Sequence, residues 1–468
     1  MSITNFSFDV VFLGGGPAGY HASIFAAKKG LLAAVVEKDL LGGTCLNRGC
    51  IPTKVLHASA EALHSTREGA RFGFKLDGTA VPDMAAVADR KDAIVKKLRE
   101  GVAGLFKGNG IELFSGEGRV AEGGVVVRAA AGGEAFVSAR NVVVCTGSRP
   151  ASLPGITVDH KIVLDSDDAV SLREVPQSVL IVGGGVIGCE FADLLNRFGS
   201  QVTVVELLPR ILSTEDATAA RAVAKSFAAR GITVITDVHV GSLEAKDGTA
   251  TVSLSDGKRI EVSRVLVSVG RRSNTEGLGI DAHVDPKGSI KIDSRMRTAK
   301  SGLYAAGDCI GGLMLAHVAS REAETAVANI LGREMEMRYD AIPSCVFTSP
   351  EVASVGMTED AARQKGIDVS LGRFFAQANG QALALGDDEG FVKIVAEKGT
   401  GQLMGAVVVG KGASTMIAEL ALAVAHKMKA SDIYEVVHAH PTLSEIVLEA
   451  AADVDGMATH KTSARRRQ

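Results

Sequence analysis

Residues 8–37, FDVVFLGGGPAGYHASIFAAKKGLLAAVVE, contain the pattern that decides the fold. A short apolar run, Phe8 to Leu13, is followed by three glycines and then by a helical pattern that ends at Gly30. The next apolar run, Leu32 to Val36, reads as a second strand, and the acid Glu37 stands at its end. Strand, glycine turn, helix, strand and acid in this order are typical of a dinucleotide-binding unit.

The glycines of this unit stand where such a fold needs residues without side chains. Gly14 permits the tight turn that leaves the first strand, and Gly16 lets the backbone approach a pyrophosphate. Gly19 lets the helix pack closely on the strand, while Glu37 can accept hydrogen bonds from ribose hydroxyls. One motif of this kind is weak evidence when it stands alone.

The same unit recurs later in the chain. The strand pattern of residues 178–182 is followed by GGGVIG at residues 183–188, a helical pattern, another strand and the acid Glu206. The first glycine and the acid are 23 positions apart in both copies. Two copies with the same spacing argue against ordinary glycine loops, so two bound dinucleotides are expected.

The stretch GGTCLNRGCIPTK, residues 42–54, places two cysteines five positions apart. On a regular helix their Cα atoms would be roughly 8 to 9 Å apart, whereas a disulfide needs less than about 7 Å. A bond between Cys45 and Cys50 therefore requires a distorted helix or a loop, which Gly49 and Pro52 allow. Spacing alone leaves two interpretations open: a pair that opens and closes, or two small buried side chains that never meet.

Composition sets the class of protein. The 468 residues are 46% hydrophobic, enough for several cores, and the formal net charge of −3 gives no bulk attraction to nucleic acid or anionic membranes. Six cysteines in so long a chain do not form a secreted disulfide framework, and no export signal or apolar run of about 20 residues is visible. We expect a soluble cytoplasmic protein with no membrane span, no nucleic-acid partner and a disordered Arg-rich tail, residues 460–468.

The rest of the chain adds strands and one further acid. Residues 141–145 and 264–269 read as strands that return to the two nucleotide sheets. Asp308 follows Gly307 at a strand end, where a carboxylate can hold a sugar-alcohol chain or cap a helix. From Pro343 onward the pattern changes to antiparallel strands with helices around them and no nucleotide motif.

A histidine near the C-terminus has an acid close by. His440 precedes Pro441, and Glu445 lies on the helix that residues 441–444 can begin. A carboxylate near an imidazole fixes its tautomer and raises its basicity. Spacing alone allows a catalytic base, but it favours a structural histidine.

Taken together and in order, these motifs resemble the class I pyridine nucleotide-disulfide oxidoreductases. The resemblance rests on both glycine units, residues 42–54, residues 302–308 and residues 438–445, and it spans nearly the whole chain. It implies an α/β fold with two Rossmann-like dinucleotide-binding domains and a C-terminal α+β dimerisation domain. The expected boundaries are 1–149 for the FAD-binding domain, 150–272 for the NAD-binding domain, 273–342 for a central domain that completes the FAD site and 343–468 for the C-terminal interface domain.

The resemblance also implies which residues hold the cofactors FAD and NAD. Lys54 would lie near the flavin ring, Asp308 on its ribityl side, and Glu190 near the nicotinamide. No metal ligand is expected. The expected FAD contacts are Gly14, Gly16, Gly19, Glu37, Thr44, Lys54, Gly118, Thr146, Gly147, Asp308 and Ala316, and the expected NAD contacts are Gly183, Gly185, Gly188, Glu190, Glu206 and Gly270.

The members that this chain resembles most oxidise dihydrolipoyl groups and pass hydride to NAD⁺. The resemblance implies that His440, oriented by Glu445, takes a proton from a dihydrolipoyl thiol, whose thiolate attacks Cys45 while Cys50 leaves toward the flavin. In the family this histidine serves the disulfide of the other subunit, so an active homodimer is expected. The expected partner is a lipoyl-bearing carrier protein or a 2-oxo acid dehydrogenase complex.

Other members of the family fit less well. Relatives that use NADP carry basic residues for its 2′-phosphate, which Glu206 would repel. Mercuric-reductase-like relatives carry a C-terminal cysteine pair that residues 458–468 lack, and flavin transhydrogenases lack the pair at Cys45 and Cys50. Ser273 stands where most similar members carry proline. A non-catalytic flavoprotein scaffold is the alternative from another class, and the complete set of reactive residues argues against it.

Overall fold

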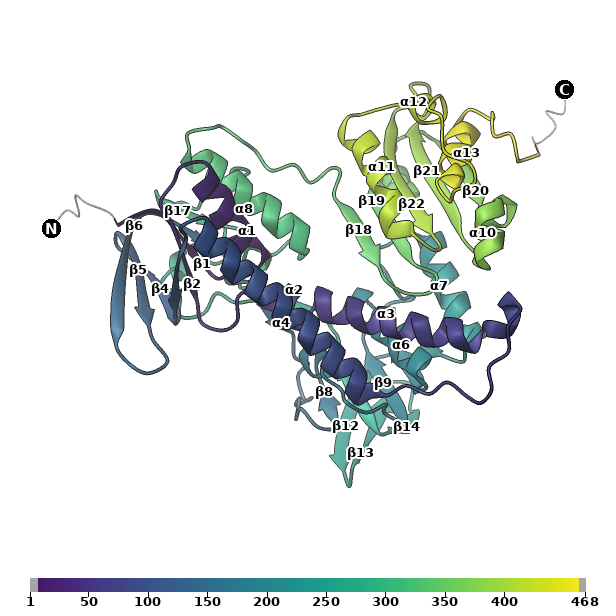
Figure 1. Ribbon diagram of the computed structural model, residues 1–468, viewed down its shortest axis with the longest axis horizontal. Coiled ribbons are helices and arrows are strands. Elements are labelled where there is room, and N and C mark those ends of the chain that lie inside the picture. Colours follow the sequence, from purple (N-terminus) through teal and green to yellow (C-terminus); the bar gives the residue numbers. More distant parts are fainter. Residues whose placement is uncertain (1–6, 463–468) are drawn as a thin grey trace. The chain divides into compact units, whose positions relative to one another are not determined.

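The computed structural model describes residues 7–462, which pack into two compact units (Figure 1). The first unit contains the described residues up to 160 together with 164–175 and 269–337. The second contains residues 161–163, 176–268 and the described residues from 338 onward. Each unit is therefore assembled from segments that are distant in the sequence, and the predicted domain boundaries within the units stay predictions.

The first unit is built on a seven-stranded sheet with the order β3-β2-β1-β6-β5-β4, in which β17 pairs with β6. β1, β2, β3 and β17 run parallel to their neighbours, and β4, β5 and the first part of β6 form an antiparallel extension. The strands are β1 (Phe8–Leu13), β2 (Ala33–Glu37), β3 (Glu112–Ser115), β4 (Glu117–Ala121), β5 (Gly124–Arg128), β6 (Glu134–Val144) and β17 (Leu303–Ala305).

Helices cover this sheet and carry the cysteine segment. α1 packs against α8, and α3 packs against α4. A short ribbon of β7 (Ser148–Pro150) and β16 (Arg271–Ser273) belongs to the same unit, as does the 3₁₀ turn η3 (Asp308–Ile310). The helices are α1 (Pro17–Lys28), α2 (Gly43–Arg48), α3 (Cys50–Arg67), α4 (Met84–Gly108), α5 (Ser166–Ala169) and α8 (Ala316–Ile330).

The second unit begins with a sheet that repeats the arrangement of the first. Its strand order is β11-β10-β9-β15-β8, and a separate three-stranded sheet has the order β12-β13-β14. The elements are β8 (Val163–Leu164), β9 (Ser178–Val182), α6 (Val186–Phe198), β10 (Gln201–Val205), α7 (Ala217–Ala229), β11 (Thr233–Ile235), β12 (Val240–Lys246), β13 (Thr249–Leu254), β14 (Arg259–Val262) and β15 (Arg264–Val267).

An antiparallel sheet of order β18-β19-β22-β21-β20 forms the C-terminal part of the second unit. The antiparallel strands expected after Pro343 are thus confirmed. Helices α11 and α13 pack on this sheet around a common apolar core. The elements are β18 (Pro343–Val346), β19 (Val352–Gly356), α9 (Glu359–Gln364), β20 (Val369–Phe375), α10 (Gly380–Leu385), β21 (Phe391–Glu397), β22 (Leu403–Val409), α11 (Ala413–Ala425), α12 (Ala430–Tyr434) and α13 (Glu445–Val454).

The two glycine units fold as their repeated pattern predicts. β1 and β9 are buried along most of their length, because a parallel strand covered on both faces is apolar throughout. The expected returning strands are confirmed, since β6 lies beside β1 and β15 lies beside β9, both parallel.

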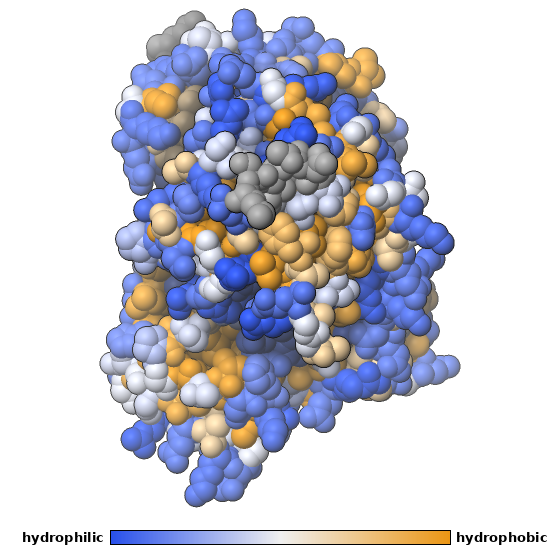
Figure 2. Space-filling model, turned by 90° about the vertical axis from the view of Figure 1, so that its left-hand side faces the viewer, coloured by the Kyte–Doolittle hydropathy of each residue, from blue (hydrophilic) through white to orange (hydrophobic). Residues whose placement is uncertain are grey.

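On the face shown in Figure 2, hydrophilic residues predominate and apolar residues form separate patches among them. Within residues 7–462, every helix falls short of the combined length and apolar character that crossing a bilayer requires.

Candidate functional site

The first glycine turn connects β1 to α1 and leaves no room for side chains. Gly14 has φ +115°, and a Cβ there would lie 2.3 Å from the carbonyl oxygen of Cys145. A Cβ on Gly19 would lie 1.8 Å from the carbonyl oxygen of Gly14. The carboxylate of Glu37 accepts hydrogen bonds from the backbone N–H of Gly15 at 2.7 Å and of Asp39 at 2.8 Å. The acid at the end of β2 is thereby held beside the glycine turn.

The second turn, between β9 and α6, repeats this geometry. Gly183 has φ +106°, and a Cβ on Gly188 would lie 1.9 Å from the carbonyl oxygen of Gly183. The carboxylate of Glu206 accepts from the backbone N–H of Gly184 at 2.6 Å and of Leu208 at 2.8 Å. The two acids therefore have the same backbone partners, a likeness that spacing in the sequence indicates but does not prove.

Both turns fit a nucleotide diphosphate. α1 and α6 begin after the N-cap residues Gly16 and Gly185, so no side chain satisfies the first N–H groups of either helix. A Cβ on Gly185 would meet nothing within 4 Å, and one on Gly16 would meet only the Cα of Gly43 at 3.7 Å. Open space in front of unpaired N–H groups at a helix N-terminus is what a pyrophosphate requires. The residues present at each turn thus fit a dinucleotide such as FAD or NAD.

The cysteine pair stands at a break between two helices. α2 ends at Arg48, Gly49 has φ −131° and ψ −110°, and α3 begins at Cys50. The distortion that a bond between Cys45 and Cys50 requires is thus found at Gly49, with Pro52 in the first turn of α3.

The side chains of the two cysteines interact across this break. The hydrogen bond with Cys50, together with burial, raises the pKa of the Cys45 thiol, while the charge of Lys54 acts in the opposite direction. The interpretation in which the two sulfurs never meet does not hold in this structure.

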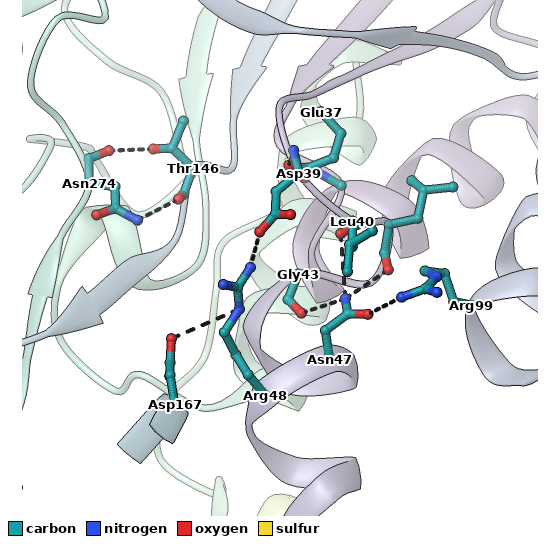
Figure 3. Close-up of polar contacts among 12 residues, drawn as sticks. Glu37, Asp39, Leu40, Gly43, Asn47, Arg48, Arg99, Thr146, Asp167 and Asn274 are labelled. Atoms are coloured by element: carbon teal, nitrogen blue, oxygen red, sulfur yellow. Dashed lines mark hydrogen bonds and ion pairs between the residues drawn. The ribbon is translucent and has the colours of Figure 1, made fainter. Parts of the chain in front are cut away.

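The residues between the cysteines tie α2 to its surroundings (Figure 3). The Asn47 side-chain amide donates to the carbonyl oxygens of Leu41 and Gly43, both at 2.9 Å, and its oxygen accepts from Arg99 at 3.3 Å. The Arg48 guanidinium forms an ion pair with Asp39 and lies 3.9 Å from a carboxylate oxygen of Asp167. These contacts hold the short helix that carries Cys45 in one orientation.

Tyr20 is a neighbour of the cysteine pair that the sequence did not single out. Burial raises the pKa of its phenol, and electrostatic interaction with Cys45 and Cys50 raises it further. Its position directly after Gly19, in the first turns of the nucleotide-binding helix, is a signal that could have identified it.

The other expected FAD contacts also belong to the first unit. Asp308 begins η3, and its carboxylate accepts a hydrogen bond from the Ser148 hydroxyl, to which the Arg271 guanidinium donates at 2.7 Å. Ser148 and Arg271 were not predicted, because each contacts Asp308 only through tertiary structure. Thr146 donates to the carbonyl oxygen of Asn274 at 2.6 Å (Figure 3).

The remaining predicted residues are distributed as follows. A Cβ on Gly118 in β4 would lie 2.3 Å from the Leu13 side chain, so this glycine is required for packing against β1. Glu190 in α6 is buried and accepts from the backbone N–H of Phe347 at 3.0 Å. Their contacts with a cofactor stay predictions, as do those of Thr44 in α2, Gly147 after β6, Gly270 before β16 and Ala316 at the start of α8.

His440 and Glu445 form a pair in the second unit. The Nδ1 atom of His440 lies 2.8 Å from Oε1 of Glu445, whose other oxygen accepts the backbone N–H of Thr442 at 2.8 Å. The Thr442 N–H and the imidazole lower the pKa of the Glu445 carboxyl. The His440 side chain is exposed, so it is available to a group outside its own chain.

Comparison with known proteins supports the interpretation of these sites. The pyridine nucleotide-disulphide oxidoreductase family model matches residues 8–323, and the dimerisation domain of the same family matches residues 342–451, which supports a homodimer. A dihydrolipoyl dehydrogenase of Bacillus subtilis is 42% identical over 470 residues, covering 97% of this chain and 99% of that protein. One from Chlamydia muridarum is 40% identical over 452 residues, covering 96% and 97%.

A solved structure gives the same result in three dimensions. LpdA from Mycobacterium tuberculosis has a TM-score of 0.90 and 29% identity, and the match covers 95% of this chain and 99% of that one. The sequence matches, the shared structure, the two glycine turns and the cysteine pair agree, and the chain belongs to the pyridine nucleotide-disulphide oxidoreductase family.

Proposed function

We propose that this chain is a dihydrolipoyl dehydrogenase, which oxidises protein-bound dihydrolipoyl groups to lipoyl with FAD and NAD⁺. The observation that carries the proposal is the cysteine pair at the break between α2 and α3, in the same unit as the first glycine turn. The dihydrolipoyl dehydrogenases of Bacillus subtilis and Chlamydia muridarum match nearly the whole chain and support it.

The proposed reaction begins with a proton transfer to His440. Because Nδ1 of His440 is bonded to Glu445, its Nε2 is the nitrogen that accepts a proton from the substrate thiol. The Glu445 carboxylate stabilises the imidazolium that results. In the homodimer this imidazole serves the cysteines of the other subunit.

The cysteine pair then exchanges disulfide bonds with the substrate. In the oxidised enzyme, the substrate thiolate forms a bond to the Cys45 sulfur, and the bond between Cys45 and Cys50 breaks, so that Cys50 leaves as thiolate. The second substrate thiolate attacks the substrate sulfur of the mixed disulfide and releases Cys45, which takes up a proton. The products are a lipoyl disulfide and the reduced enzyme, with Cys45 as thiol and Cys50 as thiolate.

The glycine turns hold the two cofactors of this reaction. Bound FAD supplies the two-electron chemistry that couples oxidation of the dithiol to hydride transfer to NAD⁺. Glu37 and Glu206 each accept hydrogen bonds from an adenosine ribose, and Lys54 and Asp308 contact the flavin half of FAD. We propose a lipoyl-bearing carrier protein, or a 2-oxo acid dehydrogenase complex, as the partner and the cytoplasm as the location.

A Cys45→Ser variant tests the proposal. It should lose lipoamide turnover by at least about three orders of magnitude, because no mixed disulfide can form at this position. It should retain FAD, measured by its visible absorbance, since the glycine turn is built from other residues. Dye reduction by NADH should survive, because this reaction does not use the disulfide.

A Cys345→Ser variant is the matched control, since Cys345 lies in β18 of the other unit and should not change lipoamide turnover. Normal lipoamide turnover in Cys45→Ser would show that the proposed exchange is wrong. Loss of turnover accompanied by loss of FAD would contradict the assignment of the flavin site to other residues.

A further inference from the structure

Helix α13 carries three carboxylates on one face. Glu445, Glu449 and Asp453 are each four residues apart, a spacing that places them one above another along the helix. Like charges at this spacing repel one another and destabilise a helix unless each has a partner. The first of the three is the acid that holds His440.

The C-terminal segment supplies partners for the other two carboxylates. Nδ1 of His460 lies 2.7 Å from Oε1 of Glu449, and the backbone N–H of His460 donates to Oε2 at 3.2 Å. Nζ of Lys461 lies 2.5 Å from Oδ2 of Asp453. The described residues of the tail that was expected to be disordered thus return to α13, while residues 463–468 lie outside the described residues.

The contact with His460 matters because the Glu449 carboxylate is buried. Glu449 is only 4% exposed, whereas 70% of the His460 side chain is exposed. A buried carboxylate without a partner is costly, so the exposed histidine compensates a charge that cannot reach water. The family's dimerisation model ends at residue 451, so His460 and Lys461 lie beyond the matched region.

We propose that His460 is a positioning residue for the pair of His440 and Glu445: by holding the Glu449 carboxylate with its ring and its backbone N–H, it keeps Glu445 aimed at the imidazole. This inference rests on the proposed function, in which His440 is the base. The neighbouring charge of His460 helps to lower the pKa of Glu445, after the Thr442 N–H and His440. Without it, the Glu449 charge would act on Glu445 from one helical turn away.

Other titratable groups near α13 have partners of their own. On β20, the Arg373 backbone N–H donates to Asp453 at 2.8 Å, and on α12 the Tyr434 hydroxyl lies 3.1 Å from Asp455. On β21, Lys393 bonds Asp216. The further pairs around this part of the unit are His438 with Glu419, Thr400 with Glu397 and the Lys429 backbone N–H with Asp432.

The test compares the pH profiles of lipoamide turnover in two variants with opposite charge effects. In His460→Gln the uncompensated Glu449 favours the protonated imidazole of His440, so the acid limb should move to higher pH by a few tenths of a unit. In Glu449→Gln the anion is removed, so the acid limb should move to lower pH. Glutamine is close in shape to glutamate, so this second variant carries the test even where the first does not fold.

Three controls separate charge from shape. His460→Arg places a cation beside Glu449 and should not move the acid limb to higher pH, and Glu449→Gln combined with His460→Gln should lie near the wild-type profile. Lys461→Met should shift the profile less, since Asp453 is two turns from Glu445. Dye reduction by NADH should be unchanged in all variants, because it does not use the base.

Two results would overturn the inference. If His460→Gln and Glu449→Gln both leave the acid limb unchanged, or shift it in the same direction, His460 has only a structural role. If His440→Gln, measured in parallel, keeps lipoamide turnover, then the proposed base is wrong and the inference falls with it. These failures are distinguishable, because only the second affects the assignment of His440.

Discussion

At the scale of single residues, we expect Glu206 to decide which nicotinamide cofactor the second unit accepts. Its carboxylate is held by two backbone N–H groups at the glycine turn, where it can accept from a ribose but repels a 2′-phosphate. We expect NADH to exceed NADPH in kcat/KM by at least about 100-fold, which corresponds to a few kcal/mol in a partly desolvated site. Glu206→Arg should narrow this gap, as measured by lipoamide reduction with each cofactor.

Glu206→Gln is the matched control for that substitution. It removes the negative charge but keeps an oxygen that can accept a backbone N–H, so it should narrow the gap less than arginine does. Equal kcat/KM for the two cofactors in the unmodified enzyme would contradict the role given to Glu206.

At the scale of elements, the two glycine turns have the same geometry and lie in different units. A Cβ at residue 188 would lie 1.9 Å from the Gly183 carbonyl oxygen, so Gly188→Ala must push α6 away from β9. We expect the KM for NADH to rise at least about tenfold while FAD content stays normal, because the first turn is untouched. FAD absorbance and steady-state kinetics together check this expectation.

Gly104→Ala provides the comparison, since Gly104 lies inside α4 and a Cβ there meets nothing within 4 Å. It should be neutral or stabilising, by about 0.5 to 1 kcal/mol, because alanine favours a helix interior over glycine. An unchanged KM for NADH in Gly188→Ala would show that the second turn does not hold the nucleotide.

At the scale of the whole molecule, a buried ion pair joins segments that are far apart in sequence. Nζ of Lys393 lies 2.6 Å from Asp216 and 3.2 Å from Glu359, and Lys393 and Asp216 are 2% and 3% exposed. Lys393→Met leaves Asp216 buried without its cation, so we expect a loss of about 3 to 5 kcal/mol in the free energy of unfolding. Urea unfolding at neutral pH measures this loss. The control is Lys225→Met, which removes an exposed ion pair with Glu389 and should change the free energy of unfolding by less than about 0.5 kcal/mol.

The ion pair of Lys393 and Asp216 also makes the free energy of unfolding depend on pH. Burial by itself would raise the pKa of Asp216, but Lys393 and the backbone N–H groups of Thr218 and Ala219 lower it below its ordinary value. Its contribution to stability is therefore complete above the ordinary aspartate pKa of about 3.9 and is lost as the pH falls through the lower folded value. In Lys393→Met the lysine no longer lowers this pKa, so less stability should be lost as the pH falls. An identical pH dependence in both proteins would contradict this account.

The sequence predicts the features whose residues lie close together in the chain. The glycine turns, their acids and the break at Gly49 depend on residues close together in the chain, and the structure has them as expected. Contacts such as Ser148 with Asp308 or His460 with Glu449 join residues without any periodic pattern, so only the folded chain brings them together. The apolar pattern of residues 413–428 runs past the end of α11 at Ala425, because Lys427 adopts φ +54°.

Strand β17 has a consequence for how the chain is made. It pairs with β6 at residues 142–144 but is not synthesised until residues 303–305, roughly 160 positions later. At about 5 to 20 residues per second, the ribosome leaves this edge of the nascent sheet uncovered for roughly 8 to 32 s. An open strand edge is a template for pairing with other chains. We therefore expect newly made chains to pass through a period in which this strand edge is open to pairing with other chains.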